Sequence, residues 1–186
     1  MSSSSSYLIN NRFPPIPATQ SKSLTATEIT TAIDFVNRHN FIFTEFTHET
    51  MLSTFLPDAT VYHTHGTLHG HTEFKSFFEN IYGFFIPGIA RSATNHVVDR
   101  DEDGGVTVRY LETLVRYGYG KEEEDGVDDP YVVTGKDAVR GDGLPAVWWV
   151  GTMVDRLRMT EDGWRIYERY LGAPVRNGGL DLPKKA

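Results

Sequence analysis

The chain has 186 residues, 39% of them hydrophobic and 12% aromatic, which is enough for one globular domain to bury a core without disulfides or metals. Its formal net charge of −7 at pH 7 argues against nucleic acid or a membrane as partner, because both attract clustered Lys and Arg. The absence of cysteine excludes disulfide scaffolds, cysteine-ligated zinc and thiol nucleophiles. The sequence lacks a secretory-signal pattern and the run of about 18 apolar residues that a membrane span needs, so we expect a soluble, cytoplasmic protein.

Three segments differ in composition from the rest of the chain. Residues 1–23 are rich in serine and proline and predict a flexible arm, and residues 174–186 predict a C-terminal tail. Between them, residues 24–173 are expected to form one domain. The acidic segment 121–143 interrupts it and is long enough to be a lid, a partner surface or a disordered loop.

The first ordered elements are predicted to be helices. Thr25 and Glu28 have the spacing of a capping box. The apolar residues that follow recur at helical spacing: Ile29, Ala32, Ile33 and Val36. A second helix is predicted over residues 48–56, where Pro57 ends it, and a third from about residue 72 to Gly83.

The remaining elements are predicted to be strands: residues 59–65, 93–99, 106–119, 146–159 and 164–171. Asp103-Gly104-Gly105 and Glu161-Asp162-Gly163 are typical of hairpin turns. Helices followed by an antiparallel meander predict an α+β protein rather than a βαβ protein. We expect a cone-shaped barrel, in which three N-terminal helices wrap a curved, mainly antiparallel sheet around a pocket.

Histidines cluster around the predicted strand at residues 59–65, with the spacing H-x-H-x₃-H-x-H from His63 to His71. Two histidines two residues apart on a strand face the same way and could begin a metal site. However, His69 and His71 flank a predicted turn and should point outward, and no carboxylate falls at suitable spacing. We therefore expect no metal, with His63 in the pocket and His65 at its rim.

A second candidate site combines two neighbouring predicted strands. Alternation gives His96 the same face as Thr94 and Val98, and imidazole suits acid–base catalysis near neutral pH, although a structural histidine fits the same pattern. The next strand carries four residues on one face: Tyr110, Glu112, Leu114 and Arg116. If this face lines a pocket, Glu112 could orient His96 or act as a base itself, with its pKa raised by loss of water. The alternative is an exposed Glu112 on a solvated face, and the periodicity leaves the choice open.

Three stretches of the sequence resemble the nuclear-transport-factor-2-like superfamily, and within it the SnoaL-like branch. They are Met51-Leu52-Ser53-Thr54-Phe55-Leu56-Pro57-Asp58-Ala59-Thr60-Val61, Leu68-His69-Gly70-His71-Thr72-Glu73-Phe74 and Asp162-Gly163-Trp164-Arg165-Ile166. The likeness covers roughly residues 25–173. It implies the fold more specifically than the chemistry, because the fold hosts isomerases, dehydratases, epoxide hydrolases, polyketide cyclases and non-catalytic binding modules.

One motif, Ala93-Thr94-Asn95-His96-Val97-Val98, resembles the strand of scytalone dehydratase and bile-acid dehydratase relatives that carries a catalytic histidine. The resemblance implies that His96 takes the place of that histidine and that His63 stands where scytalone dehydratase has a water-holding tyrosine. It also implies that Arg116 stands near the position of the dehydratase's second strand histidine and Thr152 near the position of a pocket serine of that enzyme. The chain departs from the pattern in its first helix, where Phe43-Thr44 replaces a Tyr and Asp pair.

These observations predict a cofactor-independent lyase or isomerase, of dehydratase or cyclase type, acting on a hydrophobic polyketide- or terpenoid-like molecule of secondary metabolism. His96, oriented by Glu112, would remove a proton next to a carbonyl, and His63 or Tyr110 would hold the oxygen. Aromatic residues such as Trp148 would form the core or the pocket wall.

Two other functions stay open. The same cone could serve a non-catalytic ligand-binding or dimerisation module, and a homodimer is possible in either case. An epoxide hydrolase would need two pocket carboxylates and an arginine, for which Glu112, Asp155 and Arg116 are candidates.

Overall fold

The computed structural model describes residues 16–20, 23–45, 47–64, 66–82, 86, 88–116, 146–172 and 174–180. The acidic segment 121–143, His65, Phe84-Phe85, most of the N-terminal arm and residues 181–186 lie outside these residues. The expectations for those parts of the chain therefore stay predictions.

The described helices are α2 (Ala26–Glu45), α3 (His48–Ser53) and α4 (Gly70–Phe77), which continues into the π-helical turn η1 (Phe78–Tyr82). The described strands are β1 (Phe55–His63), β2 (Gly66–His69), β3 (Ile89–Arg100), β4 (Val106–Arg116), β5 (Ala146–Thr160), β6 (Gly163–Leu171) and β7 (Val175–Arg176), followed by the short 3₁₀ turn η2 (Gly178–Leu180). None of these helices is long and apolar enough to cross a membrane.

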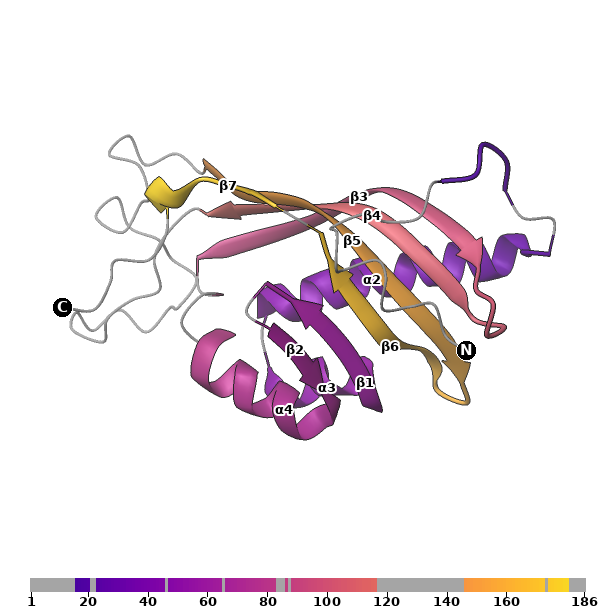
Figure 1. Ribbon diagram of the computed structural model, residues 1–186, viewed down its shortest axis with the longest axis horizontal. Coiled ribbons are helices and arrows are strands. Elements are labelled where there is room, and N and C mark those ends of the chain that lie inside the picture. Colours follow the sequence, from indigo (N-terminus) through magenta and orange to yellow (C-terminus); the bar gives the residue numbers. More distant parts are fainter. Residues whose placement is uncertain are drawn as a thin grey trace.

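The seven strands form one curved sheet in the order β2-β1-β6-β5-β4-β3, with β7 paired to β5. The pairing of β1 with β6 is parallel, and the other pairings are antiparallel. Helix α2 packs across β3 and β4, while α4 packs on β1 and β2 (Figure 1). The predicted α+β class is confirmed, with a sheet that is open between its outer strands β2 and β3 rather than closed into a barrel.

The predicted capping box is present at the start of α2. The Thr25 hydroxyl accepts a hydrogen bond from the Glu28 N–H at 3.2 Å, and the Glu28 carboxylate accepts one from the Thr25 N–H at 2.9 Å. Hydrogen bonds from Thr25 and from Arg100 lower the pKa of Glu28 to about 2. Arg100 is the last residue of β3, so its ion pair with Glu28 also connects the first turn of the helix to the sheet.

The second helix is shorter than predicted. It ends at Ser53, and Phe55, expected on its buried face, instead opens β1 beside Ile166 of β6. Two local features account for this. The residue before Pro57 is disfavoured in the helical conformation, and the Thr54 carbonyl accepts a sheet hydrogen bond from the Ile166 N–H at 2.9 Å.

A β-bulge in β3 changes which face His96 occupies. Thr94 pairs with Leu111 and Val97 with Arg109, so Asn95 and His96 together stand opposite Tyr110. Asn95 takes a left-handed conformation with φ of 55°, which Asn tolerates better than most residues. His96 therefore faces Tyr110, whereas Thr94 lies on the other face, and the expectation that Thr94 shares a face with His96 is wrong.

Residues 174–180, expected in a tail, pack on the sheet. Val175 and Arg176 form β7 beside Val150 and Trp149 of β5. Leu180 is buried in a small cluster with Trp148. The hydrophobic contacts of this segment cover one end of β5.

Candidate functional site

A cavity of about 350 Å³ lies between the α2 face of the sheet and the α4–η1 segment. Aromatic side chains make up much of its wall: Phe43, Phe55, Phe77, Phe78, Tyr82 and Trp149. Gly151 pairs with Glu112, and a Cβ there would come within 2.6 Å of the Trp149 ring. The absence of a side chain at Gly151 therefore gives the indole its place beside Glu112.

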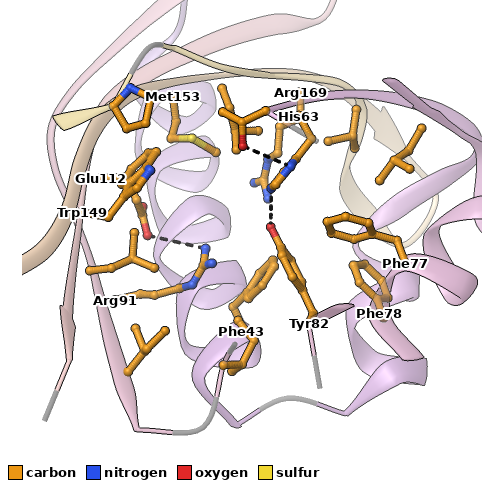
Figure 2. Close-up of a pocket in the computed structure, with 18 of the residues that line it drawn as sticks. Phe43, His63, Phe77, Phe78, Tyr82, Arg91, Glu112, Trp149, Met153 and Arg169 are labelled. Atoms are coloured by element: carbon orange, nitrogen blue, oxygen red, sulfur yellow. Dashed lines mark hydrogen bonds and ion pairs between the residues drawn. The ribbon is translucent and has the colours of Figure 1, made fainter. Parts of the chain in front are cut away.

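Glu112 is the acidic residue that lines the cavity (Figure 2). Its side chain is 1% exposed, and neither carboxylate oxygen has a hydrogen-bond partner within the described part of the chain. Burial raises the pKa of Glu112 to about 7, although the charges of Arg91 and Arg169 and an interaction with the Asn40 side chain oppose the rise. A carboxyl group that exchanges its proton near neutral pH thus faces an apolar cavity.

This pKa predicts how Glu112 affects stability. The folded protein holds the proton up to about pH 7, whereas an unfolded chain releases it near the ordinary pKa of 4.5. Because the folded state binds more protons in this window, the free energy of unfolding falls as the pH rises from 4.5 to 7. We expect Glu112→Gln, which cannot ionise, to gain about 3 kcal/mol of stability relative to wild type between pH 4.5 and pH 8. Urea unfolding of both proteins across this range measures the gain, and a difference that stays constant with pH would contradict it.

Arg91 extends from β3 to Glu112. Its Nη1 atom lies 3.7 Å from a Glu112 carboxylate oxygen, and its guanidinium carbon lies 3.7 Å from the centre of the Phe43 ring. The side chain is 10% exposed, and its Nε atom is buried without an acceptor among the described residues. Arg91 therefore places a cation and an unused N–H donor next to the carboxylate.

A second buried arginine, Arg169 of β6, also lines the cavity. It donates from Nε and Nη2 to the two oxygens of Asp155, at 2.6 and 2.7 Å. The Tyr110 hydroxyl donates to Asp155 at 2.9 Å, and Arg169 Nη1 contacts His39 Nε2. Burial alone would lower the pKa of Arg169, but Asp155 raises it, so the guanidinium stays charged.

His63 and Tyr82 form a polar pair in the cavity wall. His63 Nε2 and the Tyr82 hydroxyl are 2.9 Å apart, and the His63 ring stands edge-on to Phe77. Burial raises the pKa of Tyr82, and Arg91 opposes that rise. In Figure 2 the Arg91 guanidinium lies between Glu112 and the Tyr82 hydroxyl.

Some of the predicted site residues line the cavity, and the others lie outside its wall. Glu112, His63 and Trp148 line the cavity. Arg116 is on the face of Glu112 but is fully buried, with its guanidinium 4.5 Å from the centre of the Trp148 ring. Thr152 pairs with Leu111, which places it on the opposite face of the sheet from Glu112.

His96 and Tyr110 lie close to the cavity without lining it. Their rings stack at 5.7 Å with an angle of 26° between the planes. Burial lowers the pKa of His96, and its Nε2 atom is buried without a partner among the residues that the structure describes. The bulge thus turns His96 toward Tyr110, whereas Glu112 faces the cavity itself.

The described histidines of the H-x-H-x₃-H-x-H run turn to different partners. His69 Nδ1 lies 3.3 Å from the Thr60 hydroxyl. His71 is half-buried rather than pointing outward, because its Nε2 reaches the Phe55 carbonyl at 3.1 Å. Within the described ranges, no three metal-binding side chains converge.

Sequence reasoning missed four residues of the site: His39, Tyr82, Arg91 and Arg169. Arg169 had a detectable signal, because it stands between Glu168 and Tyr170 in a strand rich in aromatic and aliphatic residues, and a charged residue on the buried face of such a strand needs a buried partner. The others lie on elements whose face toward the cavity depends on contacts far away in the sequence.

An open, curved α+β sheet with a pocket under its helices is the arrangement of nuclear-transport-factor-2-like proteins with a cystatin-like fold. The chain belongs to the SnoaL-like domain family, whose sequence model matches residues 25–170. It is similar in structure to a putative scytalone dehydratase from Novosphingobium aromaticivorans, with 16% identity, a TM-score of 0.59, and coverage of 81% of this chain and 88% of that one.

Two further solved structures show the same fold. A protein of unknown function with a cystatin-like fold from Nostoc punctiforme is 17% identical, with a TM-score of 0.59 and coverage of 80% of this chain and 92% of that one. ActVI-ORFA from Streptomyces coelicolor is 12% identical, with a TM-score of 0.57 and coverage of 76% and 94%. No curated protein matches the chain.

Proposed function

We propose that this protein is a cofactor-independent acid–base catalyst of lyase or isomerase type, a dehydratase or cyclase, acting on a hydrophobic, cyclic and oxygenated small molecule such as a polyketide or terpenoid. The observation that carries the proposal is Glu112, a buried carboxyl group that faces an apolar cavity and that no described residue hydrogen-bonds with normal geometry. Its pKa of about 7 suits a general base at neutral pH. Membership of the SnoaL-like family and the likeness to a putative scytalone dehydratase support the same reaction class.

In the proposed mechanism, ionised Glu112 removes a proton from the carbon next to a substrate carbonyl. The electron pair of the broken C–H bond forms the C=C bond of an enolate, and the carbonyl oxygen takes up the negative charge. The Arg91 Nε–H and the Arg169 guanidinium are preorganised donors for that oxygen. The enolate then expels a β-hydroxyl group, is protonated at another carbon, or attacks an internal electrophile.

His63 and Tyr82 supply the second proton transfer. Their hydrogen bond of 2.9 Å lets one group donate while the other restores the proton. A hydroxyl leaving group protonated by this pair departs as water, which balances the proton taken by Glu112. The site thus contains a base, oxygen donors and an acid without any group from outside the chain.

We assign proton abstraction to Glu112 rather than to His96 because Glu112 lines the cavity and His96 stacks on Tyr110 beside it. The sequence left both roles open for Glu112, orienting a histidine or acting as the base. The second role is favoured because neither carboxylate oxygen is held by a hydrogen bond of normal geometry from the described residues.

The proposal is tested with 2-tetralone, a bicyclic ketone with exchangeable α-hydrogens. Wild-type protein is expected to catalyse the exchange of these hydrogens for deuterium, with a rate that rises through pH 7 and then levels off, because the ionised form of Glu112 is active. Proton NMR follows the exchange, and the same buffer without protein gives the background. Binding of 2-naphthol, an aromatic analogue of the enol, is measured by fluorescence. Binding without catalysed exchange, or a rate that falls through pH 7, would contradict the proposal.

A further inference from the structure

His39 is buried on the cavity side of α2, and both of its ring nitrogens have partners. The side chain is 1% exposed and stands edge-on to Phe43 and Phe55, with ring centres 5.4 and 5.6 Å away. Its Nδ1 atom lies 3.0 Å from the Thr54 hydroxyl, and its Nε2 atom contacts Arg169 Nη1. A histidine of α2 thereby connects the turn after α3 to an arginine in the cavity wall.

These contacts determine where the His39 proton lies. The Thr54 hydroxyl has one hydrogen, which it donates to the Met51 carbonyl at 2.7 Å. Toward His39 the hydroxyl can therefore only accept, so Nδ1 carries the proton. Arg169 can only donate, so Nε2 is the acceptor. The neutral ring with its proton on Nδ1 satisfies both contacts.

The burial of His39 and its charged neighbours keep the ring neutral. Loss of water is the main reason that the pKa of His39 lies well below its ordinary value of 6.5, and the charges of Arg169 and Arg91 lower it further. A cationic ring would place a third positive charge beside two arginines and would turn an N–H toward the donors of Arg169. His39 is thus an uncharged acceptor at neutral pH.

The donors of Arg169 are almost all used within the described residues. A guanidinium has five N–H bonds. Nε–H binds one oxygen of Asp155, and the two Nη2 hydrogens reach the other oxygen of Asp155 and the Tyr110 hydroxyl. One Nη1 hydrogen binds His39. This leaves a single Nη1–H on a side chain that lines the cavity.

We infer that His39 is a positioning residue, which holds the Arg169 guanidinium so that its remaining N–H points to a substrate oxygen. A neutral acceptor suits this role, because it fixes the orientation of the arginine while leaving the pairing of charges to Asp155. The ligand class that follows is an oxygen that gains negative charge, such as an enolate or a phenolate. This inference rests on the proposed function, in which Arg169 stabilises the enolate.

The activity test compares two substitutions of His39. Leu removes both ring contacts, whereas the side-chain oxygen of Gln can still accept from Arg169. We expect His39→Leu to lower kcat for 2-tetralone exchange by about 10- to 100-fold with little change in KM, because the lost orientation matters for the enolate and not for the ketone. His39→Gln is expected to recover most of kcat, and 2-naphthol binding should weaken in the same order.

Val36→Ala is the matched control for a loss of packing. Val36 is fully buried on the same helix, belongs to the main hydrophobic core and lies outside the polar cluster. If lower stability alone reduced kcat, this variant would behave like His39→Leu. Equal kcat values in His39→Leu, His39→Gln and wild type would overturn the positioning role.

Nitrogen-15 NMR of the wild-type protein tests the inference without any substrate. His39 is expected to show a protonated Nδ1 and an unprotonated Nε2 from pH 5 to pH 8, and Thr54→Val, which removes the Nδ1 acceptor, should shift these signals. A cationic ring or a protonated Nε2 would overturn the inference even if His39→Leu failed to fold. Full exchange activity in Glu112→Gln would instead refute the proposed function, and the NMR result would still decide the role of His39 toward Arg169.

Discussion

Glu112→Gln is expected to lower the protein-catalysed exchange of 2-tetralone by about 10²- to 10⁴-fold, the usual contribution of a general base. The amide has nearly the shape of the carboxyl group but cannot accept the proton. Glu112 lies in the cavity, and no described residue hydrogen-bonds its oxygens with normal geometry, so the substitution removes only the 3.7 Å ion pair with Arg91 and the weak interaction with Asn40. The fold should therefore persist, with the gain in stability above pH 4.5 that follows from the raised pKa of Glu112, and the loss of rate reports on the reaction.

The comparison needs a control that makes the same chemical change elsewhere. Glu102 is exposed in the turn between β3 and β4, and Glu102→Gln is expected to keep the wild-type rate. Near-wild-type exchange in Glu112→Gln, together with a large loss in His96→Gln, would transfer the base role to His96. Equal rates in all three variants would exclude both residues as the base.

The local elements of the fold could be predicted because neighbouring residues decide them. The capping box at Thr25 and Glu28 involves residues three apart, and both predicted hairpin turns join antiparallel strands. Alternation along β4 also predicted which residues share a face with Glu112, because β4 keeps its register with β3 and β5 around that residue.

The irregular positions could not be predicted in the same way. A bulge adds one residue to a strand and reverses the faces of the residues beyond it. The bulge at Asn95 and His96 therefore changed the neighbours of the histidine that the sequence singled out. A second irregularity lies between Arg156 and Leu157, where β5 pairs with β6. It is next but one to the pairing of Asp155 with Arg169.

Contacts between distant residues limited the prediction of the site more than the bulges did. His39 and Arg169 are separated by 130 positions, and Tyr110 and Asp155 by 45. Periodicity assigns a residue to a face but not to a partner on another element. His63, which the resemblance to known dehydratases singled out, lines the cavity, whereas the arginines beside Glu112 come from strands whose contacts the sequence did not reveal.

Breaking the buried ion pair behind the cavity is expected to have a large effect on stability. Asp155→Asn should destabilise the protein by about 3–5 kcal/mol, because it leaves the charge of Arg169 buried without its counter-ion. Asp155 is 0% exposed and Arg169 is 4% exposed, so bulk water does not reach the place of the lost carboxylate. Urea unfolding at pH 7 measures the change.

A double-mutant cycle with Arg169→Met separates the ion pair from the surrounding packing. Each single substitution strands a charged partner, whereas the double variant buries neither charge. We therefore expect the double variant to lose about 2 kcal/mol less than the sum of the two single losses. The loss of stability that remains in the double variant arises because Tyr110 and His39 lose their contacts with Asp155 and Arg169. Strict additivity would mean that Asp155 and Arg169 stabilise the fold independently, and the rigid support of Arg169 at the cavity wall would then have to come from other contacts.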